Sequence, residues 1–500
     1  MKRLVIASAV LAIFVPAVAL AQDHSGHAPA PVPAPSPSPA APEPEPDHAT
    51  MDHSHGLVTA EVGPTTEDAS TDPAQSDRGQ MDHGQMDHSH MPGMDHSAMP
   101  GMDQPATEHG AGDATGHSGH AIPEGPVEAS GTARLPQAEG MMPGLHFGLG
   151  DGWTGMAHGY VWGIYSDQGG PRGDDMAFVQ SMGMLMAESE FEGGRVQFKA
   201  MLSADPLMGD RGYPLLFAAG ETAGGQPLVD RQHPHDLFME LAARVDVDVA
   251  EGARAFVYGG PVGEPALGPP AFMHRASARL NPEAPITHHW FDSTHITFGV
   301  LTAGVAGKLW QLEASAFRGE EPDENRWDIE EPRLDSWSVR ATLNPSPNWA
   351  MQVSYGRLDQ PEALHSGEDE GRATASVHYN SGTGLAATAA FSAKNRIPGP
   401  TLTAWLAEAN WDISDRHTLF GRFENAENDE LFPDHDDPLH DMAFRVSKFQ
   451  AGYAYTLPAG PFALSLGGSA ALFIKPDALD ASYGDNPMGY TLFAKLTLGR

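Results

Sequence analysis

The stretch WSVRATLNPSPNWAMQVSYG, residues 337–356, contains two segments in which apolar and polar residues alternate. The apolar positions are Trp337, Val339, Ala341 and Leu343 in the first segment and Trp349, Met351, Val353 and Tyr355 in the second. Alternation with a period of two predicts a strand with one apolar face, and the Pro- and Ser-rich residues 344–347 between the segments predict a turn. The stretch therefore predicts two consecutive strands.

The same period recurs along the chain from about Gly144 onward. It is strict in VQFKAMLS (196–203), RATASVHY (372–379), FQAGYAYTL (449–457) and YTLFAKLTLG (490–499). It is looser in 155–166, 176–190, 237–249, 252–260, 295–303, 308–318, 385–394, 401–411, 416–426 and 462–474. No long segment has a helical period, so the body of the chain is predicted to be all-β.

Three features favour an outer-membrane antiparallel β-barrel of about 14–16 strands. The strands match the length needed to cross a membrane, and their polar faces carry Lys, Arg, Glu and Gln at mid-strand. Aromatic residues lie near the predicted strand ends, at Trp337, Trp349, Tyr379 and Tyr490. Long connections, predicted at 204–235, 260–292, 319–333, 358–371, 427–442 and 475–488, alternate with tight turns. The sequence ends in Leu-Gly-Arg instead of the aromatic residue common in such barrels, which leaves a soluble β protein as the alternative.

The N-terminus indicates export from the cytoplasm. Lys2 and Arg3 precede an apolar run that ends in the cleavage sequence Ala19-Leu20-Ala21, so residues 1–21 are predicted to be a signal peptide. The chain has no cysteine and a formal charge of −37. This charge excludes nucleic acid as a partner and favours cations.

Residues 22–140 are predicted to be disordered, and residues 141–500 to form the barrel. The first of these segments is rich in Ala, Pro, Gly, Asp, His and Met and has no apolar periodicity, so it lacks the apolar surface needed to offset its ordering entropy. Its Pro/Ala-rich part, residues 28–46, is predicted to act as an extended spacer.

Two repeats, MDHSHMPG (86–93) and MDHSAMPG (94–101), lie in the disordered segment. Thioethers select Cu(I) or Ag(I), and imidazoles also bind Cu(II) and Zn. Exposed methionine is easily oxidised, so retaining it in such a segment indicates a use for sulfur. The predicted copper ligands are Met81, His83, Met86, His88, His90, Met91, Met94, His96, Met99 and Met102.

These repeats, placed between a signal peptide and a barrel-like body, resemble the copper-resistance protein B family of the bacterial outer membrane. The motif resemblance covers residues 81–103, and the resemblance in architecture covers the whole chain. It implies an outer-membrane barrel with a Met/His-rich copper-binding segment on its periplasmic side. The barrel half matches in general design only, so no site in the barrel is carried over from the family.

Three histidine groups in the body, HPHD, MHR and THHWFDSTH, suggest a second metal site or a gate. The candidate ligands are His233, His235, Asp236, His274, His288, His289 and His295. They lie in or beside the two longest predicted connections and are expected to meet at one rim. The alternative is that both connections plug the barrel and the histidines only bond to the backbone.

Two predictions concern which face of a strand points to lipid. If a strand begins at His295, then Ile296, Phe298 and Val300 face lipid. Methionines 182, 184 and 186 share one strand face, and lipid-facing packing is preferred over a methionine ladder in the lumen.

The sequence thus predicts an outer-membrane copper-tolerance protein that captures copper ions with a periplasmic arm. Its expected partners are outer-membrane lipid, metal ions and other periplasmic copper-tolerance proteins. The alternatives are a soluble periplasmic or secreted metal-sequestering protein, and a general porin with an incidental tail. No enzyme is expected, because the chain has no G-x-S-x-G nucleophile elbow and no complete G-x-G-x-x-G motif.

Overall fold

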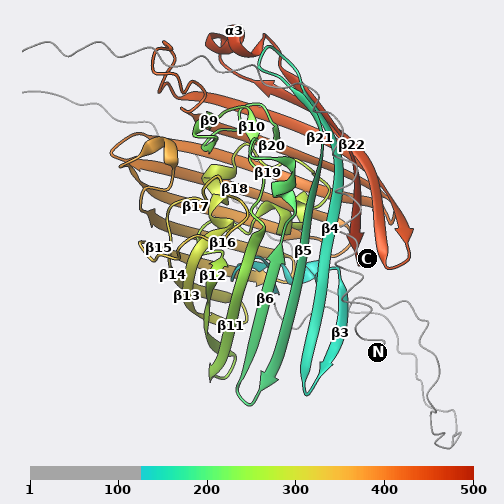
Figure 1. Cartoon of the computed structure of the whole chain (residues 1–500). Coiled ribbons are helices and arrows are strands. Elements are labelled where there is room, and N and C mark those ends of the chain that lie inside the picture. Colours follow the sequence, from blue (N-terminus) through green and yellow to red (C-terminus); the bar gives the residue numbers. More distant parts are fainter. Residues whose placement is uncertain (1–125, 500) are drawn as a thin grey trace, which may run out of the picture. The chain divides into compact units, whose positions relative to one another are not determined.

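The computed structural model describes residues 126–499, and in them each predicted strand segment lies in a strand of one closed antiparallel sheet (Figure 1). The sheet consists of β3 (Leu145–Gly150), β4 (Trp153–Gln168), β5 (Asp175–Phe191), β6 (Gly194–Leu202), β11 (Phe238–Ala250), β12 (Ala253–Gly263), β13 (Thr297–Gly307), β14 (Trp310–Phe317), β15 (Ser336–Ser346), β16 (Trp349–Leu358), β17 (Asp369–Asn380), β18 (Leu385–Ile397), β19 (Thr401–Ser414), β20 (His417–Asn428), β21 (Phe444–Ala459), β22 (Phe462–Ile474) and β23 (Met488–Leu498).

The barrel closes between β23 and β4. Strand β23 pairs with residues 159–168 of β4, and the short strand β3 pairs with residues 153–157 of the same strand. Because β3 and β23 share one strand position, the barrel has 16 positions. The predicted fold class is confirmed.

The two rims differ as expected for an outer-membrane barrel. At one rim, hairpins close with short turns at 151–152, 192–193, 251–252, 308–309, 347–348, 381–384, 415–416 and 460–461. At the other, the connections are 169–174, 203–237, 264–296, 318–335, 359–368, 398–400, 429–443 and 475–487. We call these the short-turn rim and the long-loop rim.

The two faces of the sheet carry different side chains. Val339, Val353 and Leu312 are among the large apolar residues exposed on the outside. Inward positions are polar, and Arg340 and Gln352 are buried there. Alternation places one set toward lipid and the other toward the lumen. No helix within residues 126–499 has the length and apolar character required to cross a membrane.

The remaining elements lie in the connections and before the barrel. The short strands form the pairs β1 (Val127–Glu128) with β2 (Arg134–Leu135), β7 (Tyr213–Pro214) with β10 (Arg231–Gln232), and β8 (Glu221–Ala223) with β9 (Gln226–Leu228). The α-helices are α2 (His288–Phe291) and α3 (Asp480–Tyr483), and the 3₁₀ helices are η2 (Gln137–Glu139), η3 (Asp205–Met208), η4 (Phe272–His274), η5 (Ala276–Ala278), η6 (Ser293–His295), η7 (Ala363–His365) and η8 (Asp477–Leu479).

The connection 264–296 folds into the lumen and is tied to the barrel wall by buried ion pairs. The Arg275 Nε lies 2.6 Å from Glu408 of β19, and the Lys448 Nζ of β21 lies 2.7 Å from Glu283. Buried charges are stable only when they are paired in this way. The connection is therefore a plug that is fixed by charge pairing with the lumenal face.

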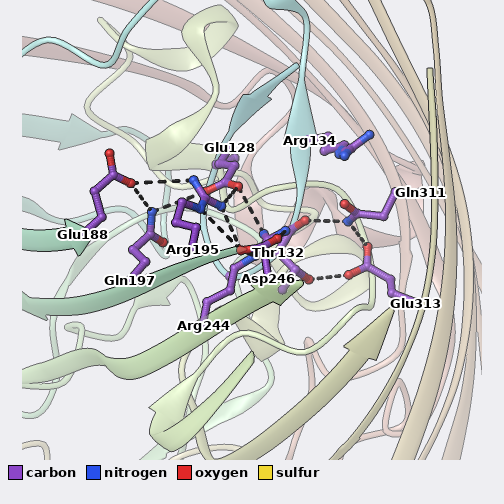
Figure 2. Close-up of polar contacts among 12 residues, drawn as sticks. Glu128, Thr132, Arg134, Glu188, Arg195, Gln197, Arg244, Asp246, Gln311 and Glu313 are labelled. Carbon is purple, nitrogen blue, oxygen red and sulfur yellow. Dashed lines mark hydrogen bonds and ion pairs between the residues drawn. The ribbon is translucent and has the colours of Figure 1, made fainter. Parts of the chain in front are cut away.

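The segment 126–140, predicted to be disordered, instead forms β1, β2 and η2 inside the barrel. Figure 2 shows Glu128 beside Arg195 and Arg244 of the wall, with Glu128 Oε1 2.5 Å from Arg195 and 3.4 Å from Arg244. In the same view Thr132 donates a hydrogen bond to Glu313. Polar contacts with the barrel wall order this segment. Such contacts leave no apolar period in the sequence, so alternation does not reveal them.

Both predictions about lipid-facing residues are wrong. On β5, Leu185 is 55% exposed, whereas Met182 and Met184 are 1% and 5% exposed and point into the lumen. His295 ends η6 and does not begin a strand, and Ile296, Phe298 and Val300 are buried inside, whereas Leu301 and Val305 of β13 face outward. A period of two shows which residues share a face, and the register with neighbouring strands decides which face is inside.

Candidate metal centre

Five of the predicted histidines meet inside the barrel. The ring centroids of His233 and His288 are 5.9 Å apart, and those of His288 and His289 are 5.5 Å apart. His295 lies 5.1 Å from His288 and 5.4 Å from His235 by the same measure. The connections 203–237 and 264–296 thus bring their histidines together, as the sequence predicts.

Asp292 orients two of these imidazoles. Its carboxylate Oδ1 lies 2.8 Å from His288 Nδ1, and its backbone carbonyl lies 2.7 Å from His295 Nδ1. Arg275 and the backbone N–H of Phe272 donate to the other carboxylate oxygen, each at 2.9 Å. These contacts fix one nitrogen of each ring, which leaves the Nε2 atoms of His288 and His295 for a further partner.

Carboxylates from other connections extend the cluster. Three trios have one potential ligand atom per residue, all within 4.8 Å of one another. The trios are Glu221, His233 and His289; His289, Glu321 and Glu362; and Glu362, His365 and Glu430. His289 and Glu362 each belong to two trios, so the seven residues form one continuous row. We call this row the plug cluster.

Several nitrogen and oxygen atoms of the plug cluster that could bind a metal lie close to one another without forming a hydrogen bond. His233 Nε2 lies 3.2 Å from Glu221 Oε1, and His289 Nδ1 lies 3.3 Å from Glu321 Oε1. His233 Nε2, His289 Nδ1 and Glu321 Oε1 are all buried without a hydrogen-bond partner. Imidazoles and carboxylates in this proportion are the ligands that Zn²⁺ and Cu²⁺ take in proteins. The donor set fits a borderline divalent cation.

The cluster also favours positive charge. Burial alone lowers the pKa of His289, but the carboxylates of Glu321 and Glu221 outweigh burial and raise this pKa to about 9. His233 lacks such compensation, and burial together with Arg326 holds its pKa well below the usual value. Burial raises the pKa of Glu221 to about 7. The carboxylates therefore create a negative potential at His289.

The other predicted ligands in the barrel lie around the plug cluster. His235 Nδ1 is 2.9 Å from Asp205 Oδ2 and its ring contacts His295. Asp236 belongs to no trio and pairs with Arg326 at 3.3 Å, and the same guanidinium lies 2.7 Å from Glu221 of the plug cluster. His274 lies at the end of η4, borders a separate cavity and belongs to no trio. His288 also lies outside the trios but contacts two of their histidines, His233 and His289. His295 contacts His288 and His235.

Sequence reasoning did not single out five members of the plug cluster, namely Glu221, Glu321, Glu362, His365 and Glu430. Each lies in a long connection outside the three histidine groups. Glu362 and His365 are three residues apart, and Glu321 and Glu430 each follow another acidic residue. Only the folding of four connections to one place brings them together. The ten predicted ligands from Met81 to Met102 lie outside the described residues.

Comparison with known proteins finds similarity to solved structures in overall architecture alone. No family model matches the chain, and no curated protein matches it. Among solved structures, it is similar to OmpF of Salmonella typhi in complex with daunomycin (9% identity, TM-score 0.47, covering 71% of this chain and 100% of that one). An anion-selective porin from Comamonas acidovorans gives 10% identity and a TM-score of 0.43, covering 69% of this chain and 100% of the porin. The outer-membrane channel DcaP of Acinetobacter baumannii gives 11% identity and a TM-score of 0.43, covering 71% of this chain and 100% of the channel.

The class that the fold defines is a porin-like antiparallel β-barrel with a plugged lumen. Within that class, the chain differs from an open channel by the buried row of imidazoles and carboxylates in its plug.

Proposed function

We propose that this protein is an outer-membrane barrel that binds copper ions in copper tolerance. The plug cluster carries the proposal, because seven imidazole and carboxylate side chains converge in a barrel interior. In the proposal, the Met/His-rich arm that precedes the barrel captures copper ions, and the plug cluster holds them within the barrel. Thioethers of the arm suit Cu(I) or Ag(I), and the plug cluster suits Cu(II) or Zn(II).

The exterior of the barrel supports the proposed location. Its large exposed apolar residues, such as Leu312, Val339 and Val353, would be unfavourable in water but suit lipid. This favours a membrane-spanning protein over a soluble metal-sequestering one. Arg134 donates to the carbonyls of Gly307 and Trp310 at the short-turn rim, and this rim faces the periplasm in bacterial barrels. In the proposal, the arm lies on the periplasmic side, where it meets other periplasmic copper-tolerance proteins.

Metal content of plug variants tests the proposal. Full-length protein with His233→Ala and His289→Ala is compared with the unaltered protein after Cu(II) or Zn(II) loading and dialysis. The arm is common to both, so any difference in bound metal reports the barrel. The double variant is expected to lose about one ion per chain, since it removes both imidazoles of one trio. His417→Ala is the matched control, because His417 is exposed and bonds to Tyr453 far from the plug.

Equal metal content in all three proteins would refute a plug site and favour a general porin with an incidental tail. Heat-modifiable migration on a gel confirms that each variant is folded. Sensitivity of cells to copper then tests the physiological part of the proposal, with the double variant expected to protect less than His417→Ala.

A further inference from the structure

Methionines concentrate on one part of the lumenal wall, away from the plug cluster. Residues 126–499 contain 14 methionines, and eight of them belong to one buried group. Its methionines are Met142, Met156, Met182, Met184, Met186, Met201, Met239 and Met273, and Val262, Ile296 and Phe298 pack among them. We call it the methionine cluster. Most of its members lie on β4, β5, β6 and β11, which are neighbours in the barrel (Figure 1).

Strand register places these sulfur atoms opposite one another. Met156 of β4 is the direct partner of Met186 of β5, and His158 is the partner of Met184. Met184 is in turn the partner of Met201 of β6. Directly opposed side chains have Cβ atoms about 4.5–5.5 Å apart, which long thioether side chains easily span. The wall therefore carries a ladder of thioethers with an imidazole beside it.

The ladder borders an open space. A cavity of about 650 Å³ is lined by Met142, Met156, Met184 and Met186 together with His274. His274 Nε2 is buried without a hydrogen-bond partner. A methionine group that served only to fill the core would close such a space, because methionine adapts its shape to gaps. Here the thioethers and a free imidazole nitrogen border a volume that can admit a ligand.

The charged part of the cavity wall is nearly balanced. The lining includes the carboxylates of Glu128, Glu188 and Glu240 and the cations of Arg195 and Lys199. Figure 2 shows Glu188 and Glu128 on either side of Arg195, at 3.6 and 2.5 Å. The thioethers are neutral, so these three carboxylates and two cations leave an excess of one negative charge in the cavity wall. This balance suits a monovalent cation.

We infer that the cavity beside the methionine cluster is a binding site for a soft monovalent cation, Cu(I) or Ag(I). Thioether sulfur selects such ions over Zn(II), which takes nitrogen, oxygen and thiolate ligands. Met156, Met184, Met186 and His274 supply the ligands. The inference goes beyond the proposed function, because it assigns the reduced metal to a site in the barrel wall that shares no residue with the plug cluster.

The cavity is bordered by the beginning of the described chain and extends to the short-turn rim. Residues 126–130, the first that the structure describes, form part of its wall. Thr154, next to the turn at 151–152, and Arg195, next to the turn at 192–193, place the cavity at the short-turn rim.

The test follows individual methionines in the full-length protein. The protein is labelled with [methyl-¹³C]methionine, kept in detergent and titrated with Ag(I), which does not change oxidation state. Signals are assigned by single Met→Leu substitutions. After the arm signals have saturated, the methyl signals of Met156, Met184 and Met186 are expected to shift, and Zn(II) is expected to leave them unchanged. Met184→Leu should weaken this step about tenfold or more. Met176→Leu is the matched control, because Met176 packs in a different core group.

Unchanged signals of Met156, Met184 and Met186 at excess Ag(I) would overturn the inference and leave these residues as core packing. Equal shifts with Zn(II) would also overturn it. The readout uses the unaltered protein, so it does not depend on a variant that folds. Failure here is distinct from failure of the proposed function, because His233→Ala with His289→Ala removes only the Zn(II) or Cu(II) step and should leave the Ag(I) shifts intact.

Discussion

At the scale of single residues, Asp292 orients histidines of the candidate metal centre. It holds His288 through one carboxylate oxygen and Arg275 through the other, at 2.8 and 2.9 Å. Asp292 lies within a histidine-rich motif of the sequence, so its proximity to His288 and His295 could be predicted. Its pairing with Arg275 could not, because Arg275 reaches it only through the fold of η4 and η5.

Asp292→Asn should lower the affinity of the plug for Cu(II) or Zn(II) by about 10- to 100-fold. The amide keeps the size of the side chain but removes the negative charge that orients His288. Competition with a chromophoric chelator measures the change in the full-length protein. Asp248→Asn is a useful comparison, because Asp248 is exposed near the short-turn rim and pairs with Arg254, which belongs to no trio. An equal effect of both substitutions would argue against an orienting role of Asp292.

Glu264 makes the stability of the barrel depend on pH. Burial, together with the nearby Glu240 and Asp292 carboxylates, raises the pKa of Glu264 from 4.5 to about 8. The folded protein therefore keeps a proton on Glu264 that the unfolded chain releases, and this contribution to stability is present below pH 4.5 and is lost as pH rises toward 8. Glu264→Gln cannot ionise, so its melting temperature should fall less between pH 5 and pH 9 than that of the unaltered protein. An identical fall in both proteins would refute this assignment.

At the scale of elements, alternation predicted the strands but not their orientation. The segment 176–190 corresponds to β5 within a residue at each end, yet its methionines face the lumen and not lipid. Both faces of β5 carry large apolar residues there, so hydrophobicity alone does not identify the outer face. The segment 126–140 shows a related limit, because its order comes from pairing of Glu128 and Thr132 with wall residues.

The arm is predicted to discriminate between oxidation states of copper. Replacing Met86, Met91, Met94 and Met99 with Leu should weaken Cu(I) binding more than Cu(II) binding. Leucine keeps the size and apolarity of methionine but removes the sulfur, so the loss reports ligation. Competition titrations with Cu(I) and Cu(II) chelators on the full-length variant measure the two affinities. Equal losses would assign binding to the histidines and carboxylates alone.

At the scale of the whole molecule, the barrel holds thioethers in one group and imidazoles with carboxylates in another. The methionine cluster borders a cavity at the short-turn rim, and the plug cluster is built from connections of the long-loop rim. The sequence predicted the barrel and its two rims, because both follow from local patterns. It did not predict the row of carboxylates, which depends on how separate connections fold into one lumen.

A membrane-spanning barrel of this kind should migrate faster on a gel when it is not heated, since the closed sheet resists detergent until it is heated. The protein should also be recovered with outer membranes and released by detergent. Migration that does not change with heating, together with release by buffer alone, would contradict the membrane-spanning architecture and favour the soluble alternative.

The central claim is that the plug binds a metal ion. The most direct measurement is anomalous diffraction from crystals of the full-length protein grown with Zn(II) or Cu(II), collected on both sides of the metal absorption edge. We expect an anomalous peak within about 2–2.3 Å of ligand atoms of Glu221, His233 and His289, or of the adjoining trio that shares His289. A map in which these side chains are well ordered and no peak lies among them at saturating metal would contradict it.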